Sequence, residues 1–426
     1  MRSTLVFYLL SFLVSFGASV AGSPPQKLNS QWLLHLIDSQ NLKNIPEVLN
    51  SLKTHAPRLL ENHFLVHSSM SCQGSSYDKP RAVLFTDDAH FTLTFTEEAP
   101  GETAFEISEV IPDEKQIRFY DLDFAHGHEG KPYHFTEPED CLRCHGAATR
   151  RAPAKILAGI PGFFSSIYGA FHDEIPLGSY ESDRYLRFLT LAQRSKTYSQ
   201  LIGLPKPSEI KQSYPARTHY QPQTGNETPA YRRFVESAEE LNIERFLWML
   251  ESHPHIHELK AAVLAALLDC PDIDSFVSQP ELLSPHSEEE SPRTYEEILS
   301  KVRQGITSSF RFNLEMFEEN HAANLGLRDW HLPHATRVAK LVRILEPQGH
   351  FKLDDWSMEN IRLGYAFGEI DGSSIFDRLI PKLVRLFFFE EKAQWRDLMN
   401  SPQATPTLQY CESLKETSQK LTRIRK

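Results

Sequence analysis

Residues 81–95 read RAVLFTDDAHFTLTF, and this segment gives the clearest indication of the fold of the N-terminal half of the chain. Apolar side chains alternate with polar or small ones on both sides of Asp87-Asp88, at Val83, Phe85, Phe91, Leu93 and Phe95. A period of two places the apolar side chains on one face of a β-strand. We therefore expect two antiparallel strands joined by a turn at the two aspartates.

The strand signal continues beyond this segment, and a helical signal precedes it. Phe105 and Ile107 alternate with polar neighbours, as do the apolar residues between Ile117 and Phe124. Residues 28–62 instead repeat apolar side chains at the helical spacing. The sequence thus predicts helices followed by a small antiparallel sheet.

The first 21 residues have the pattern of a secretory signal peptide. An apolar run from Leu5 to Phe16 is followed by small residues up to Ala21, which predicts cleavage after Ala21. The run is too short for a comfortable membrane span. The alternative is an uncleaved N-terminal anchor. We expect an exported protein, placed in the periplasm of a Gram-negative bacterium, with no membrane span after cleavage.

The most specific chemical signal is Cys141-Leu142-Arg143-Cys144-His145, which reads C-x-x-C-H. This spacing is typical of c-type haem attachment, in which Cys141 and Cys144 link the haem and His145 becomes the proximal iron ligand. Export supports this interpretation, because in the cytosol the same motif would favour a zinc or redox site. We therefore expect one covalently attached haem c. Arg150 and Arg151 either pair with its propionates or are solvated surface arginines.

The second axial position is open to several residues. The next methionine beyond His145 is Met249, so a nearby methionine ligand is missing. We expect a histidine close to the motif in preference to any one methionine. The candidates are His126, His128, His134, His172 and, from the C-terminal half, Met358.

Composition favours an ordinary globular protein, with 40% hydrophobic and 24% charged residues. A formal net charge of -11 argues against nucleic acid as a partner. Outside the haem motif, Cys72, Cys270 and Cys411 remain. In an oxidising compartment two of them can pair, and the sequence leaves the pairing open. It carries no signal for an oligomeric state.

The pattern divides the chain into three parts after the signal peptide. Residues 22–202 hold the sheet and the haem-binding loop or helix region, and residues 203–230, with five prolines, form a linker or long loop. Residues 231–426 form a helical domain. The predicted fold class is α+β and mostly α, with a small antiparallel sheet before the haem motif and a helical C-terminal half.

The segment from Asp121 to Asp173 carries a family resemblance. Residues 138–146, PEDCLRCHG, resemble the haem-attachment segment of monohaem c-type cytochromes. The patterns Ile160-Pro161-Gly162-Phe163 and Ile167-Tyr168-Gly169 are similar to those of large, uncharacterised exported cytochrome c-like proteins of proteobacteria. The resemblance implies haem linkage at Cys141 and Cys144 and iron ligation by His145. It implies no substrate and no reaction. The strand signal before the motif departs from the small cytochrome c pattern, in which a helix precedes it.

Three hypotheses follow for the function. The leading one is a periplasmic monohaem cytochrome that transfers single electrons to and from a redox partner protein and is a carrier rather than an enzyme. The second is a haem enzyme or sensor, peroxidase-like or gas-binding, with an open distal site. The third is a haem-free exported protein whose C-x-x-C forms a disulfide or metal site.

Overall fold

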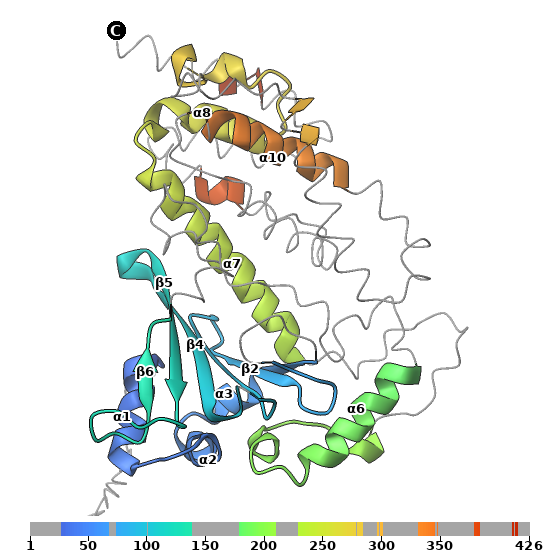
Figure 1. Cartoon of the computed structure of the whole chain (residues 1–426). Helices are drawn as coiled ribbons and strands as arrows, with labels where there is room; N and C mark the ends of the chain where they lie inside the picture. Colours follow the sequence, from blue (N-terminus) through green and yellow to red (C-terminus); the bar gives the residue numbers. More distant parts are fainter. Residues whose placement is uncertain are drawn as a thin grey trace, which may run out of the picture.

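A computed structural model of the chain shows two parts joined by one long helix (Figure 1). The first part contains the sheet and its covering helices, and the second consists of helices. The structure describes residues 27–67, 74–99, 101–138, 179–209, 229–277, 279–283, 296–297, 299–300, 331–345, 347, 379–383, 411–412 and 414–415.

Helices α1, Ser30–Gln40, and α2, Ile45–His55, begin where asparagine side chains cap them. Asn29 Oδ1 accepts from Trp32 N at 2.8 Å, and Asn44 Oδ1 accepts from Glu47 N at 3.0 Å. Such caps satisfy backbone N–H groups that have no partner inside the helix. Helix α1 ends at Asn41 in the left-handed region, which asparagine tolerates better than most residues. A short helix, α3, follows at Pro57–Glu61.

A six-stranded antiparallel sheet follows these helices, with its strands in sequential order. The strands are β1 His63–Val66, β2 Arg81–Phe85, β3 Phe91–Phe95, β4 Ala104–Ile111, β5 Gln116–Asp123 and β6 His134–Thr136. Residues 81–95 form the predicted strands β2 and β3, but the faces differ from the prediction. Leu84 lies opposite Leu93 and Phe85 lies opposite Thr92, so Val83 and Phe85 are on the other face from Phe91, Leu93 and Phe95. The turn between them includes Ala89, whose positive φ of 52° closes it.

The expectation of a mostly helical chain with a small sheet is wrong. The sheet has six strands and organises the whole described N-terminal half, and only 52% of the described residues are helical. The sequence pattern does not predict two of the six strands, β1 and β6. In β1 the residues Phe64, Leu65 and Val66 follow one another with no polar residue between them. Strand β6 has only three residues, and it forms by pairing with β5.

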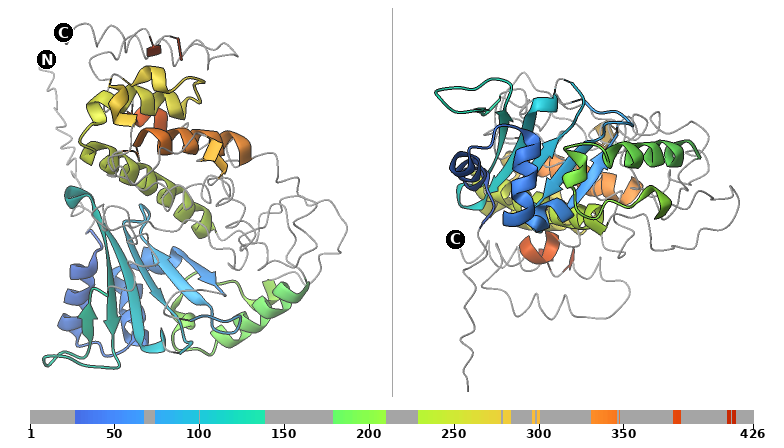
Figure 2. Two further views of the ribbon diagram at one scale, coloured as in Figure 1. Left: turned by 45° about the horizontal axis from the view of Figure 1, so that its top comes forward. Right: turned by 90° about the horizontal axis from the view of Figure 1, so that it is seen from below.

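The two faces of the sheet have different neighbours, as the views in Figure 2 show. One face contributes Leu84, Leu93, Phe95, Phe105 and Leu122 to a core shared with helices α1 to α3 and with α6, Ser179–Ala192. The opposite face meets α7, Pro229–Ser252. Short 3-10 helices lie at Gly101–Thr103, Pro112–Glu114, Tyr198–Gln200, Pro207–Glu209, Asp274–Phe276 and Pro280–Leu283.

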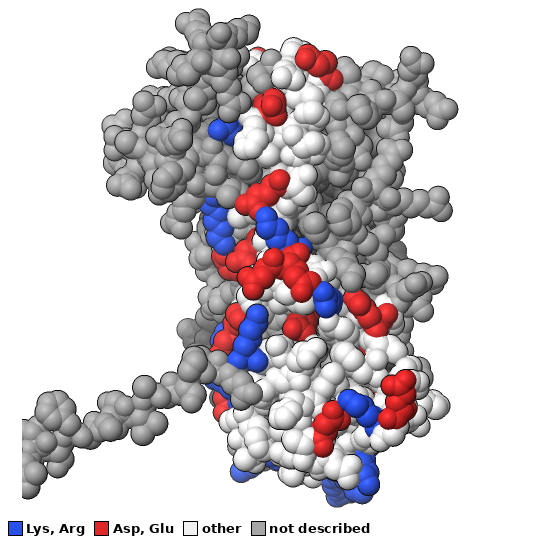
Figure 3. All heavy atoms as spheres, turned by 90° about the vertical axis from the view of Figure 1, so that its left-hand side faces the viewer, with Lys and Arg blue, Asp and Glu red and all other residues white. Residues whose placement is uncertain are grey.

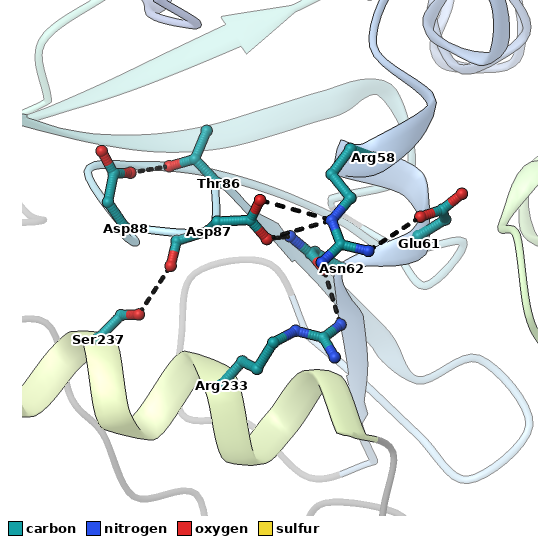
Figure 4. A network of polar contacts seen from close by, with 8 residues as sticks. All are labelled: Arg58, Glu61, Asn62, Thr86, Asp87, Asp88, Arg233 and Ser237. Atoms are coloured by element: carbon teal, nitrogen blue, oxygen red, sulfur yellow. Dashed lines mark hydrogen bonds and ion pairs between the residues drawn. The ribbon is translucent and has the colours of Figure 1, made fainter.

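Helix α7 is fastened to the sheet by an aromatic contact and by a polar network. The Phe234 ring lies 4.9 Å from Phe64 and 5.1 Å from Phe85, measured between ring centroids. Beside it Arg233 Nη2 donates to Asn62 Oδ1 at 2.8 Å, and Ser237 Oγ donates to the Asp87 carbonyl at 2.8 Å (Figure 4).

Charged side chains of both signs gather across the middle of one face of the molecule (Figure 3). An ion pair between Lys115 and Glu251 joins the turn before β5 to the end of α7. Because both side chains are partly exposed, this pair contributes little stability. The aromatic contact of Phe234 therefore dominates the attachment.

The second part is built around its own hydrophobic core. It combines α7 with α8, Ile256–Leu267, and α10, His331–Leu345. Cys270 and Cys411, both buried in this core, form a disulfide between positions 141 residues apart in the sequence. Within the described ranges we find no helix that combines the length and apolar character of a membrane span.

Candidate functional site

Strands β5 and β6 form a hairpin that is followed in the sequence by the C-x-x-C-H segment. We call residues 116–136 the histidine hairpin, because it carries His126, His128 and His134. In its register Asp123 lies opposite His134, and Asp121 lies opposite Thr136. The chain is described as far as Pro138, three residues before Cys141.

The arm that extends beyond Asp123 and His134 has a defined conformation, although its composition suggests an irregular loop. At its tip His128 and Lys131 form a β-bridge, with Lys131 N donating to the His128 carbonyl at 3.0 Å. Glu129 and Gly130 between them have φ angles of 53° and 79°. Two successive positive φ angles are typical of the tight turns that close β-hairpins.

Two further contacts fix this arm. A Cβ on Gly127 would lie 2.7 Å from the Lys131 carbonyl oxygen, so only glycine permits the close approach of the two backbones. Asp38 on α1 accepts hydrogen bonds from Lys131 Nζ and Tyr133 Oη, each at 3.0 Å. The hydrogen bond from Lys131 Nζ to Tyr133 Oη, followed by the one to Asp38, raises the pKa of Lys131. The hairpin arm is thereby held against the first helix.

Asp123 organises the base of the arm. Its Oδ1 accepts from Ala125 N at 2.8 Å and from Thr103 Oγ1 at 2.9 Å, and its Oδ2 lies 3.1 Å from His126 Nδ1. Burial alone would raise the pKa of Asp123, but the hydrogen bonds from Ala125, His126 and Thr103 outweigh it and lower the pKa. Asp123 is therefore an ionised acceptor at neutral pH.

The three histidines have different surroundings. The His126 side chain is 83% exposed and contacts Asp123 through Nδ1. His128, at the tip, is exposed and lies 3.9 Å from a Glu129 carboxylate oxygen. His134 is half-buried on β6, and its ring centroid lies 5.1 Å from that of His128. The hairpin therefore gathers three of the five proposed distal ligands.

A group of polar and charged side chains extends across the sheet from β3 to the histidine hairpin. Thr94, Glu106, Asp121 and Thr136 follow one another across strands β3 to β6. Arg81 Nη2 bonds to the Glu106 carboxylate and to Thr94 Oγ1. Burial, followed by the charges of Glu106 and Asp123, raises the pKa of Asp121 to about 6, and the charge of Arg81 opposes the shift.

The sequence-based predictions do not include this polar face, although the sequence contains a pattern that indicates it. Asp121 and Asp123 flank the buried Leu122, so the period of two places both carboxylates on the face opposite the core. What the pattern lacks is the register that brings Glu106 beside Asp121. That register is set by the turn at Pro112–Glu114, which joins β4 to β5.

The remaining proposed site residues lie outside the described residues. These are Cys141, Cys144, His145, Arg150, Arg151, His172 and Met358, and Cys72 lies outside them too. Of the three cysteines beyond the motif, Cys270 and Cys411 pair. Among the described residues, no cluster of three or more histidine, cysteine, aspartate or glutamate side chains has the arrangement of a metal site.

Comparisons with known proteins add no relative to this picture. No family model, no curated protein and no solved structure matches the chain.

Proposed function

We propose that this chain is an exported, periplasmic monohaem c-type cytochrome that exchanges single electrons with a redox partner protein. The observation that carries the proposal is the pentapeptide C-x-x-C-H at residues 141–145. It follows a structured hairpin that bears three histidines. A motif for haem attachment thus lies close in the sequence to three histidines, each of which is a candidate for the second axial ligand.

The disulfide between Cys270 and Cys411 supports export. Structural disulfides persist in oxidising compartments and are rare in the cytosol. The periplasm is such a compartment, and the apolar leader ending at Ala21 points the same way. Two separate parts of the chain therefore favour the location in which haem c is attached.

The residue types in and after the motif are those that a haem c requires. Cys141 and Cys144 would hold it by thioether bonds, His145 would bind the iron, and Arg150 and Arg151 would pair with its propionates. A haem bound there would supply an iron centre that gains and loses one electron. The described residues offer a distal imidazole, because His126 has its ring held by a carboxylate.

The proposed attachment point follows the last strand of the sheet closely in the sequence. Three residues span at most about 11 Å, so the backbone of Cys141 lies within that distance of Pro138. Strand β6 pairs with β5 on one side and ends two residues before Pro138. We expect this edge and the hairpin arm to hold the second axial ligand and to limit the access of water.

A second candidate function is a haem enzyme or sensor with an open distal site. The observation that favours it is Asp121, a partly buried carboxyl group of the histidine hairpin with a pKa of about 6. A group with such a pKa is suited to proton transfer near neutral pH. Rapid binding of carbon monoxide by the native protein would favour this candidate, and refusal would favour the electron carrier.

The test is to produce the full chain in a host that has the haem-attachment machinery and to record a pyridine haemochrome spectrum. We expect the spectrum of a haem with two thioether bonds in the wild type and none in Cys141→Ala/Cys144→Ala. Cys270→Ser/Cys411→Ser is the matched control, because it removes the other cysteine pair and leaves the motif intact. A wild-type protein without haem would favour a haem-free protein with a C-x-x-C disulfide or metal site and would overturn the proposal.

A further inference from the structure

Two imidazoles of the histidine hairpin lie close together at its tip. The ring centroids of His128 and His134 are 5.1 Å apart, with an angle of 37° between the ring planes. A tetrahedral zinc ion lies about 2.0–2.1 Å from each imidazole nitrogen that binds it, which puts the centres of two rings that share the ion about 5 Å apart. The two rings therefore have the separation that a shared metal ion requires.

The backbone of the hairpin sets this separation. His134 lies on strand β6, and His128 forms a β-bridge with Lys131, whose backbone N–H donates to the His128 carbonyl at 3.0 Å. Between them Glu129 and Gly130, both with positive φ, reverse the direction of the chain. The two imidazoles are thus brought together by the fold of the hairpin before any ion binds.

The pair is accessible to solvent and lies beside a negative charge. The His128 side chain is 59% exposed, and His134 is half-buried. Glu129 Oε1 lies 3.9 Å from His128 Nδ1, so a carboxylate stands next to the pair and favours a cation there. The positive charge of Lys131 on the same arm is offset by its ion pair with Asp38.

We infer that His128 and His134 together bind one divalent transition-metal ion of the class that imidazole favours, namely zinc, copper or nickel. Two imidazoles fill half of a tetrahedral shell, so water completes the coordination and leaves the ion open to a further ligand. The site is thus simpler than a cluster of three or more protein ligands, which the described residues lack. It goes beyond the proposed function and needs no haem, because both ligands belong to the described hairpin.

The experiment titrates the full chain with zinc chloride at neutral pH and measures binding by isothermal titration calorimetry. We expect one zinc ion at the hairpin. Both His128→Gln and His134→Gln should weaken this binding by more than the about 10- to 100-fold that follows when a group that only supports a ligand is lost. His128 is exposed at the tip, so its substitution tests the site without disturbing the core.

The matched control is His126→Gln on the same hairpin. His126 Nδ1 lies 3.1 Å from Asp123 Oδ2, and its ring is 83% exposed. This variant removes an exposed imidazole near the tip but leaves the pair of His128 and His134 intact. We expect its zinc affinity to equal that of the wild type.

Copper(II) chloride is the second probe, and its electron paramagnetic resonance spectrum reports the nitrogen atoms bound to the ion. We expect two bound imidazole nitrogens in the wild type and one in His128→Gln or His134→Gln. Copper should bind more tightly than zinc, in keeping with the general order of affinity among these metals. Magnesium chloride should give no binding at the hairpin, because magnesium prefers oxygen ligands.

Several results would overturn the inference. Absence of zinc binding by the wild type would do so, and so would equal affinities in the wild type and His128→Gln, or an equal loss in His126→Gln. Zinc binding that is lost in Cys141→Ala/Cys144→Ala and kept in His128→Gln would place the ion at the C-x-x-C-H motif instead. The haemochrome spectrum tests the proposed function separately, so a failure of one leaves the other standing.

Discussion

His63 at the start of β1 shows how burial controls a single titratable group. Its ring is buried, and Nδ1 contacts the Leu60 carbonyl at 2.8 Å. Burial lowers the pKa of His63 to about 4, and the backbone hydrogen bond opposes the shift. The unfolded chain, with a histidine pKa of about 6.5, then binds more protons than the folded chain between pH 4 and 6.5.

Stability should therefore rise with pH across this window. The stabilising contribution of neutral His63 is present above pH 6.5 and is lost as the pH falls towards 4, by about 3 kcal/mol in total. Chemical denaturation at pH 4, 5, 6 and 7 measures it. In His63→Gln the pH dependence should flatten by this amount, whereas His35→Gln, on the exposed side of α1, should keep it. Equal slopes in all three proteins would refute the assignment.

Asp121 changes the stability of the protein with pH in the opposite direction to His63. Its folded pKa of about 6 lies above the unfolded value, so its favourable contribution exists at acid pH and is lost as the pH rises through 6. Asp121→Asn should thus stabilise the protein at pH 7.5, by about 1 kcal/mol after allowance for solvent screening. Asp113→Asn, on an exposed turn, is the control and should have no effect. Destabilisation at pH 7.5 by Asp121→Asn would contradict the account.

At the scale of elements, alternation predicts the strands around residues 81–95 because polar and apolar residues take turns there. It fails for β1, where Phe64, Leu65 and Val66 follow one another with no polar residue between them, and for β6, which is too short to show a period. The helical spacing of residues 28–62 predicts helices where α1 and α2 form, because their apolar residues recur on one side. Strands β1 and β6 depend instead on pairing with their neighbours in the sheet.

Helix α7 gives the clearest prediction at this scale. Phe234 is buried between Phe64 and Phe85, so its truncation leaves a cavity at the junction of the sheet and the helix. Phe234→Ala should lower the free energy of unfolding by about 3–5 kcal/mol. Leu191→Ala is the control because Leu191 is exposed on α6, and it should change stability by less than about 0.5 kcal/mol. A loss below 1 kcal/mol for Phe234→Ala would show that α7 is not docked there.

For the whole molecule, the disulfide is the largest single constraint on the second part. Cys270–Cys411 joins positions 141 residues apart in the sequence, and a long loop loses much conformational entropy in the unfolded chain when it is cross-linked. Cys270→Ser/Cys411→Ser should lower stability by about 2–5 kcal/mol, measured by thermal and chemical unfolding. Cys72→Ser leaves the bridge intact and should have no such effect. An equal loss in both variants would argue against the pairing.

Part of the candidate site can be predicted from the sequence, and part of it depends on the fold of the whole molecule. The spacing of Cys141, Cys144 and His145 is readable because haem attachment demands adjacent residues. The different surroundings of His126, His128 and His134 are not readable, since the contact of His126 Nδ1 with the Asp123 carboxylate and the turn at Glu129 and Gly130 depend on the fold. The pairing of Cys270 with Cys411 likewise required the fold of the second part.

The measurement that tests the central claim most directly is the intact mass of the purified full chain together with its pyridine haemochrome spectrum. We predict one covalently attached haem per chain in the wild type and none in Cys141→Ala/Cys144→Ala. A wild-type chain that carries no added haem mass and gives no haemochrome, when it is made with active attachment machinery, would contradict the claim.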